Sequence, residues 1–253
     1  MNQASLLETP NNALSEPHTG FENVYALVVA AGTGSRFGAN IPKQYVEIAG
    51  QTILQHCIES LATSRYIKSV CLVISVKDEM AKQLNFSLPV QLVSGGAERW
   101  QSVLAGVNAI AEQGIEDNSL ILIHDAARPC VMSQHIDAVI EAAMNEQYGA
   151  TLGVPVVDTI KRIKKDDNSS YPYIQETVDR RNLWQSQTPQ VFRAFALQQV
   201  LNEVTEQNLS ITDEASAFEV LNYPIRMVEG SRTNLKLTLP QDLALIEWLL
   251  TND

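Results

Sequence analysis

The sequence is poor in cysteine and in aromatic residues, and it contains no long hydrophobic run. Its three cysteines, Cys57, Cys71 and Cys130, are odd in number and show no CxxC spacing. This pattern favours reduced, mostly buried thiols in a cytoplasmic protein over disulfides or a zinc site. No stretch approaches the roughly 20 apolar residues of a membrane helix, and the start lacks the basic and apolar regions of a signal peptide. We therefore expect no membrane partner.

Positive charge is scarce as well. The chain has 18 lysines and arginines against 29 aspartates and glutamates, which gives a formal net charge of -11. A surface of this charge repels nucleic acids and anionic membranes, so we expect neither as a partner. An anionic ligand would need a local group of cations.

The apolar content is sufficient for one substantial core. Hydrophobic residues make up 45% of the 253 residues, and a length in this range is compatible with a single α/β domain. Residues 1–23 are polar and show no periodicity, so we predict a disordered leader there. Residues 24–253 are predicted to form one domain.

Short buried runs alternate with amphipathic segments after the leader. Residues 24–31 (VYALVVAA), 70–76 and 120–123 are apolar and rich in β-branched residues, as in strands covered on both faces. Thr52 and Ser133 are each predicted to cap a helix, the second running to about residue 147. Further strands are predicted at 90–93, 150–156 and 225–228, and further helices after 95–96, at 194–205, at 212–220 and from Pro240. The alternation predicts an α/β fold with a doubly wound, mostly parallel, Rossmann-like sheet.

The alternation breaks at residues 158–175, where two polar-apolar segments flank a charged turn. We predict a projecting β-hairpin arm at about 157–177. Because a hairpin of this kind cannot bury itself, we expect it to pack on a second subunit and the protein to form a homodimer.

A glycine-containing loop follows the first predicted strand, with the sequence AAGTGSR at residues 30–36. In open α/β sheets ligands bind beyond the carboxyl ends of the strands, where such a loop lets backbone N–H groups approach phosphate oxygens. The loop lacks the third glycine of a dinucleotide fingerprint and the GK[ST] ending of a P-loop. Arg36 and, seven residues later, Lys43 instead add two cations. The loop is typical of a phosphate-binding site.

Together with PKQY at 42–45, this loop resembles the signature of nucleotidyltransferases that activate sugar phosphates. Seven later motifs narrow the resemblance. They are GGAERWQSV (95–103), HDAARP (124–129), VVDTIKR (156–162), TVDR (177–180), TPQ (188–190), TDEAS (212–216) and EGSRTNLKLT (229–238). In this order they are similar to the motifs of 2-C-methyl-D-erythritol 4-phosphate cytidylyltransferases, over nearly all of residues 24–250.

The resemblance implies transfer of CMP from CTP to 2-C-methyl-D-erythritol 4-phosphate, with release of pyrophosphate. The product, 4-diphosphocytidyl-2-C-methyl-D-erythritol, is a precursor in non-mevalonate isoprenoid synthesis. The attacking phosphate monoester is already anionic at pH 7, so no general base is needed. Catalysis requires positioning and positive charge, which implies Mg²⁺ or another divalent cation as cofactor.

The resemblance also implies roles for individual residues. It implies Arg36, Lys43 and Lys236 as catalytic cations; Ala30, Ala31, Gly32, Gly34, Gly96, Ser102 and Ala126 as nucleotide-binding residues; and Asp125, Arg128, Thr159, Arg180 and Thr188 as substrate-binding residues. Asp125 is also the implied metal ligand, and Thr159 and Arg180 are expected to come from the partner subunit. His124, at a predicted strand end, is interpreted as structural.

Two alternatives stay open. A ribitol 5-phosphate cytidylyltransferase would share the CTP half of the site, and Thr159 with Arg180 favours methylerythritol phosphate over ribitol phosphate. A nucleotide-binding protein without catalytic activity could keep the same fold. The presence of Arg36, Lys43 and Lys236 together argues against it, because a sensor needs binding without transition-state cations.

Overall fold

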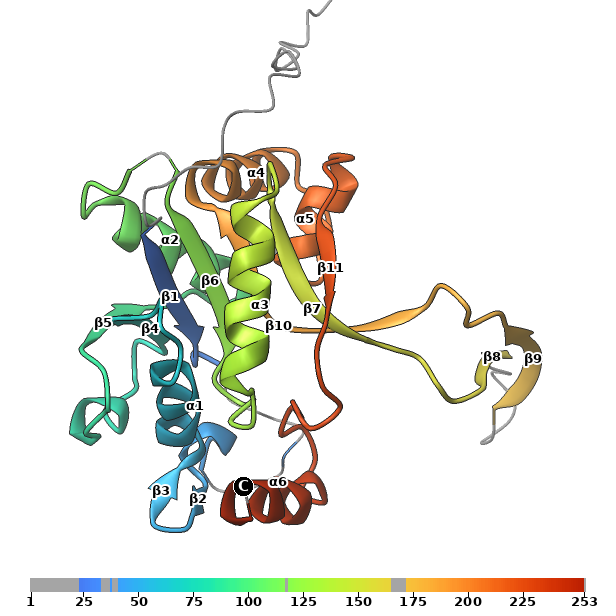
Figure 1. Cartoon of the computed structure of the whole chain (residues 1–253), viewed down its shortest axis with the longest axis horizontal. Coiled ribbons are helices and arrows are strands. Elements are labelled where there is room, and N and C mark those ends of the chain that lie inside the picture. The colour runs from blue at the N-terminus through green and yellow to red at the C-terminus, as the bar shows by residue number, and fades with distance from the viewer. Residues whose placement is uncertain (1–22, 33–36, 38–40, 117, 165–171, 253) are drawn as a thin grey trace, which may run out of the picture.

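The computed structural model describes residues 23–32, 37, 41–116, 118–164 and 172–252. Its centre is a seven-stranded sheet with the order β11-β7-β10-β6-β1-β4-β5 (Figure 1). The strands are β1 (Val24–Val29), β4 (Val70–Ile74), β5 (Val90–Ser94), β6 (Leu120–Asp125), β7 (Gly149–Pro155), β10 (Trp184–Arg193) and β11 (Arg226–Glu229). All neighbouring pairs are parallel except those that β10 makes with β6 and β7. The predicted α/β class and mostly parallel sheet are confirmed.

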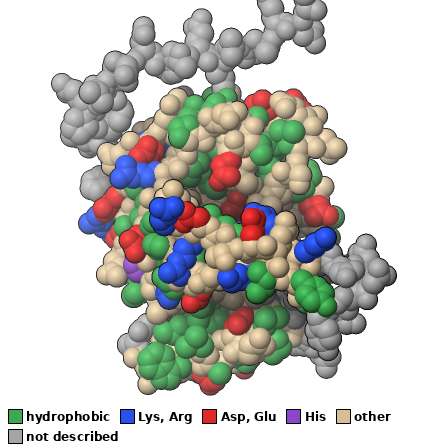
Figure 2. All heavy atoms as spheres, turned by 90° about the vertical axis from the view of Figure 1, so that its right-hand side faces the viewer, with side chains coloured by type: hydrophobic (Ala, Val, Ile, Leu, Met, Phe, Trp, Pro, Cys, Tyr) green, Lys and Arg blue, Asp and Glu red, His purple; other side chains and the backbone are tan. Residues whose placement is uncertain are grey.

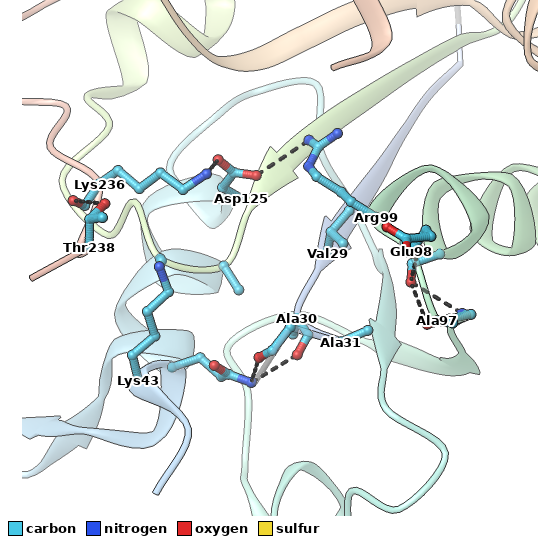
Figure 3. A pocket seen from close by; sticks show the side chains of 16 residues that line it. Val29, Ala30, Ala31, Lys43, Ala97, Glu98, Arg99, Asp125, Lys236 and Thr238 are labelled. Carbon is cyan, nitrogen blue, oxygen red and sulfur yellow. Dashed lines mark hydrogen bonds and ion pairs between the residues drawn. The ribbon is translucent and has the colours of Figure 1, made fainter. Parts of the chain in front are cut away.

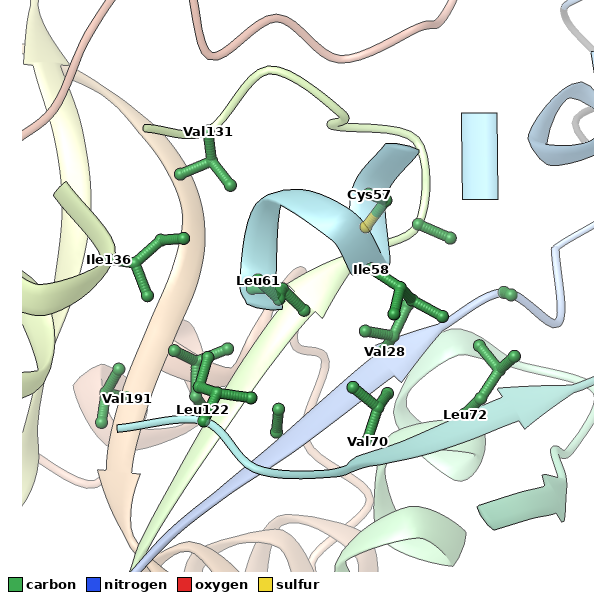
Figure 4. Close-up of a cluster of buried hydrophobic side chains, with 14 of the residues drawn as sticks. Val28, Cys57, Ile58, Leu61, Val70, Leu72, Leu122, Val131, Ile136 and Val191 are labelled. Carbon is green, nitrogen blue, oxygen red and sulfur yellow. The ribbon is translucent and has the colours of Figure 1, made fainter. Parts of the chain in front are cut away.

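Helices cover both faces of this sheet. One face packs against α1 (Ile53–Ala62) and α3 (Ser133–Met144), and Figure 4 shows the buried side chains between them and the strands. The other face packs against α2 (Arg99–Ala111), α4 (Ala194–Glu206) and α5 (Glu214–Val220). Because both faces are covered, every residue of β4 and β6 is buried, which explains their unbroken apolar sequences.

Strand β10 is the one element of the sheet that the sequence does not reveal. It is polar at its start and contains Pro189, which normally argues against a central strand. The structure accommodates the proline at an irregularity, where the register with β7 shifts between Ser186 and Gln190. The antiparallel strand therefore lies next to β6, whose carboxyl end carries Asp125.

The predicted helix starts are right for α1 and wrong in detail for two others. Thr52 forms a capping box with Gln55, as its position predicts. Ser133 is the first residue of α3 rather than its cap, because Met132 holds the cap position without a side-chain hydrogen bond. The last helix, α6 (Asp242–Thr251), begins after Pro240, and the Asp242 carboxylate accepts backbone hydrogen bonds from residues 238 and 239.

The predicted arm is present as a two-stranded antiparallel sheet of β8 (Ile160–Lys164) and β9 (Tyr173–Val178). It projects from the body of the molecule (Figure 1). Three of its apolar side chains, Ile163, Tyr173 and Ile174, are 48%, 62% and 67% exposed. Residues 1–22 of the predicted leader lie outside the described residues.

The remaining elements lie beyond the carboxyl ends of the central strands (Figure 1). They are β2 (Glu47–Ile48), β3 (Gln51–Thr52), and the short 3-10 turns Lys43–Tyr45 and Ala81–Gln83. Helix α6 packs here through Ile246 against Ile48, Ile53 and Leu237. Within the described ranges no helix has both the length and the apolar character needed to cross a bilayer.

Candidate functional site

A cavity of about 340 Å³ opens at the carboxyl ends of β1 and β6, between the start of α2 and residues 236–238 (Figure 3). This is the edge at which open α/β sheets bind their ligands. Nine of the residues predicted for the site line it. They are Ala30, Ala31, Gly32, Lys43, Gly96, Ser102, Asp125, Ala126 and Lys236.

Glycines let the loop before α2 approach that helix closely. A Cβ added to Gly95 would lie 2.6 Å from the Ser102 Oγ, and one added to Gly96 would lie 2.4 Å from the Gln101 Cβ. The Gly96 N–H donates to the Ser102 Oγ at 3.2 Å. At Gly96 and Ser102 the cavity wall is therefore backbone and a hydroxyl, which leaves room there for a flat ring, while the side chains of Ala97, Glu98 and Arg99 continue the wall.

Gln44 fixes the opposite wall. Its buried amide donates from Nε2 to the carbonyl oxygen of Ala30 at 2.8 Å and to that of Gly32 at 3.3 Å. These bonds hold the end of β1 in place from the 3-10 turn that also carries Lys43. The sequence interpretation assigned no role to Gln44, although the motif PKQY contained the signal.

Asp125 is the most strongly paired carboxylate of the site. Its side chain lies 2.6 Å from the Lys236 Nζ, 3.4 Å from the Arg99 Nη2 and 3.7 Å from the Arg128 Nε. Burial by itself raises the pKa of a carboxyl group, but these three cations together outweigh it and hold the pKa of Asp125 well below its usual range. Asp125 is therefore ionised at every physiological pH.

A chain of hydrogen bonds supports Asp125 from behind. The Asp125 N–H donates to the Thr188 Oγ1 at 3.1 Å, and that hydroxyl lies 3.0 Å from the His124 Nδ1. The His124 Nε2 lies 3.0 Å from the Arg128 carbonyl oxygen, so the tautomer protonated at Nε2 satisfies both contacts. Burial lowers the pKa of His124 to about 4. His124 is thus a neutral, structural group, in line with its interpretation from sequence.

The two lysines enter the cavity from different elements. The Lys43 Nζ donates to the Leu237 carbonyl oxygen at 2.5 Å. Lys236 also lines a neighbouring cavity of about 480 Å³, together with Arg128 and Arg232. Lys236 is thus shared by the linings of both cavities.

Not all predicted site residues gather here. Thr159 and Arg180 are exposed at the base of the arm and line neither cavity, and Thr188 is buried behind Asp125. Gly34 and Arg36 lie outside the described residues. Conversely, Arg99 lines the cavity without having been predicted, although the motif GGAERWQSV contains it.

Comparisons with known proteins agree on one family. The model of the 2-C-methyl-D-erythritol 4-phosphate cytidylyltransferase family matches residues 24–252. A protein of that name from Psychrobacter arcticus is 50% identical over 256 residues, which cover 90% of this chain and 91% of the relative. Another, from Vibrio atlanticus, is 44% identical and the match covers 93% of this chain and 98% of the relative.

Solved structures agree in fold. A crystal structure of 4-diphosphocytidyl-2C-methyl-D-erythritol synthase aligns with a TM-score of 0.76 at 36% identity, covering 90% of this chain and 99% of the other. The 2-C-methyl-D-erythritol 4-phosphate cytidylyltransferase of Francisella tularensis aligns with a TM-score of 0.75 at 29% identity, covering 90% and 100%.

Proposed function

Because the chain belongs to the 2-C-methyl-D-erythritol 4-phosphate cytidylyltransferase family, we infer that it transfers CMP from CTP to 2-C-methyl-D-erythritol 4-phosphate. The products are 4-diphosphocytidyl-2-C-methyl-D-erythritol and pyrophosphate, and the reaction belongs to the non-mevalonate isoprenoid pathway. The observation that carries this conclusion is the family match over residues 24–252, which includes every wall of the cavity.

The chemistry is an in-line displacement at phosphorus. An oxygen of the acceptor phosphate forms a bond to the α-phosphorus of CTP, while the bond from that phosphorus to the bridging oxygen of pyrophosphate breaks. The acceptor oxygen is ionised beforehand, so the protein has to bring two anions together rather than remove a proton.

Three cations are proposed to make this approach possible. Lys43 and Lys236 line the cavity, and Arg36 belongs to the glycine loop but lies outside the described residues. Positive charge fixed at the wall stabilises the charge that develops on the α-phosphoryl oxygens and on pyrophosphate. Lys236 suits a role between the substrates, because it lines both cavities.

The nucleotide is proposed to occupy the 340 Å³ cavity. Its walls are mainly small residues and backbone, which allow a pyrimidine to lie close to the loops. The proposed contacts are Ala30, Ala31, Gly32, Gly34, Gly96, Ser102 and Ala126.

The acceptor is proposed to bind next to the nucleotide, at Asp125 and Arg128. Arg128 lines the 480 Å³ cavity and forms an ion pair with Asp125, while Thr188 fixes the Asp125 backbone. Thr159 and Arg180 are proposed to complete the acceptor site of a second subunit in a homodimer. Their exposure at the base of an uncovered arm supports this arrangement.

A divalent cation, Mg²⁺ foremost, is proposed to bind together with CTP. Among the described residues no group of three or more His, Cys, Asp or Glu side chains could hold a metal by itself. Mg²⁺ often needs only one or two carboxylates, with substrate phosphates and water completing its shell. The permanently ionised carboxylate of Asp125 fits that requirement, and the bound cation would withdraw negative charge from the phosphates.

We also propose that residues 24–253 form a single domain, including the arm at about 157–177, and that residues 1–23 precede it as a disordered leader. One sheet joins strands from residue 24 to residue 229, which supports a single domain. The buried thiols of Cys57 and Cys71 support a cytoplasmic location.

The direct test is pyrophosphate release from CTP and Mg²⁺ with each of two acceptors. We expect release with 2-C-methyl-D-erythritol 4-phosphate and little with ribitol 5-phosphate. Release with ribitol 5-phosphate alone would transfer the assignment to that acceptor. Binding of CTP without turnover of either acceptor would favour a nucleotide-binding protein.

A further inference from the structure

Glu214, the first residue of α5, carries a carboxylate that the proposed reaction leaves without a role. It is 0% exposed, and its Oε2 has no hydrogen-bond partner among the described residues. Removing a carboxylate from water is costly unless it is paired, and a buried ion pair often stabilises a fold no more than apolar residues of the same volume would. Its position therefore requires an explanation other than stability.

Glu214 is not needed to cap its helix. The capping box of α5 is made by Asp213 and Ser216, and the Ala215 N–H donates to the Gln190 Oε1 at 3.2 Å. The first turn is thus held by other groups. The only polar contact of the Glu214 side chain among the described residues is a charge-assisted hydrogen bond from the Arg99 Nη1.

Arg99 connects Glu214 to the cavity. It is the first residue of α2 and comes from a distant part of the chain, 115 positions before Glu214. While its Nη1 contacts Glu214, its Nη2 lies 3.4 Å from the Asp125 Oδ1. Figure 3 shows the Arg99 guanidinium on one side of Asp125 and Lys236 on the other. The planar fork of an arginine suits such a bridge between two carboxylates, and the single ammonium of a lysine does not.

We propose that Glu214 and Arg99 are positioning residues for the cytidylyl transfer. Glu214 fixes the guanidinium of Arg99 from the protein interior, and Arg99 in turn fixes the Asp125 Oδ1. The Oδ2, which faces Lys236 at 2.6 Å, is thereby held toward the cavity. This inference rests on the proposed role of Asp125 toward the acceptor and the cation, and it adds two residues that act through Asp125.

The test is Glu214→Gln, which removes the charge and keeps the shape. We expect kcat/KM for the acceptor to fall by about tenfold or more, with KM for CTP changed less than about threefold. Glu146→Gln is the matched control, because Glu146 also pairs with an arginine, Arg226, but at the surface. The control should keep wild-type kinetics.

An Arg99→Ala background separates positioning from a general structural role. If Glu214 acts through Arg99, Glu214→Gln lowers kcat/KM by less than about twofold in that background, because the interaction is already lost. An equal loss in both backgrounds would overturn the proposal, and so would wild-type kinetics of Glu214→Gln in the wild-type background.

Arg99→Lys provides the second variant in case Glu214→Gln does not fold. It keeps the positive charge but cannot span both carboxylates, so the same acceptor-selective loss is expected, and wild-type kinetics would overturn the proposal. Failure of the proposed function is distinguishable: the wild-type protein itself would then release no pyrophosphate with the methylerythritol acceptor.

Discussion

Lys43 places its ammonium group at the cavity wall, where the Leu237 carbonyl oxygen holds it at 2.5 Å. If it neutralises charge in the transition state, Lys43→Ala should lower kcat by about a hundredfold or more, as the loss of an oxyanion donor does. The fold should persist, because the lysine lies at a cavity. Steady-state pyrophosphate release measures the effect.

The control for Lys43 is Lys82→Ala, which removes a half-exposed surface cation paired with Glu79. This variant should turn over at the wild-type rate. Turnover of Lys43→Ala within about threefold of the wild type would remove Lys43 from the catalytic group.

At the scale of single residues, His124 makes the free energy of unfolding depend on pH. Burial lowers its pKa from 6.5 to about 4 in the folded protein, so between these values the unfolded chain binds a proton that the folded protein does not. Stability is therefore lost as the pH falls through this window, by about 3 kcal/mol in total. Urea unfolding at a series of pH values should show this slope.

His124→Gln supplies the comparison, because an amide can make both contacts without titrating. As the pH falls from 6.5 to 4, the free energy of unfolding of the wild type should decrease relative to that of the variant. An unchanged difference over this range would contradict the buried neutral state of His124.

At the scale of elements, helix α1 contacts the 3-10 turn Lys43–Tyr45, which carries the lining residues Lys43 and Gln44. Its capping box joins Thr52 and Gln55, and the same segment pairs with β2. Thr52→Ala should lower the free energy of unfolding by about 1 kcal/mol, because the first turn loses an acceptor for its backbone N–H. Thermal or chemical unfolding measures this loss.

Thr63, at the other end of α1, provides the matched control. Its hydroxyl donates to the Ser60 carbonyl oxygen at an exposed position. Thr63→Ala should change stability by less than about 0.5 kcal/mol. Equal losses in both variants would mean that the capping box contributes nothing specific.

For the whole molecule, the uncovered arm is the feature that points to assembly. A shared acceptor site predicts complementation between two defective chains, Lys43→Ala and Arg180→Ala. In a mixed dimer one site carries both defects and the other carries none, so random mixing should restore about a quarter of wild-type activity. Coexpression of two differently tagged chains, followed by purification and assay, measures it.

Lys43→Ala mixed with Lys236→Ala is the control, because both lysines line the same cavity of one chain and every mixed site keeps one defect. This mixture should stay inactive. Sedimentation of the wild-type protein should report a dimer. A fully active monomer, or no recovery with Arg180→Ala, would contradict the shared site.

Much of the fold follows from local sequence. Strands β1, β4 and β6 are continuous apolar runs because the sheet is covered on both faces, and the strands of the arm are more polar because they are exposed. Strand β10 escaped prediction because Pro189 and its polar neighbours do not look like a central strand. Only its two partners, β6 and β7, and the local irregularity make it one.

The residues of the site divide in the same way, into those that the sequence reveals and those that only the structure brings together. The sequence by itself determined the glycine loop, the cations Lys43 and Lys236 and the family, because these are encoded in short motifs. The tertiary structure decided which charges meet: Asp125 lies between Lys236 and Arg99, and Arg99 reaches Glu214. The physical reason is that motifs record neighbours along the chain. A carboxylate is instead buried and paired by residues more than a hundred positions away, which only the packed sheet and helices bring together.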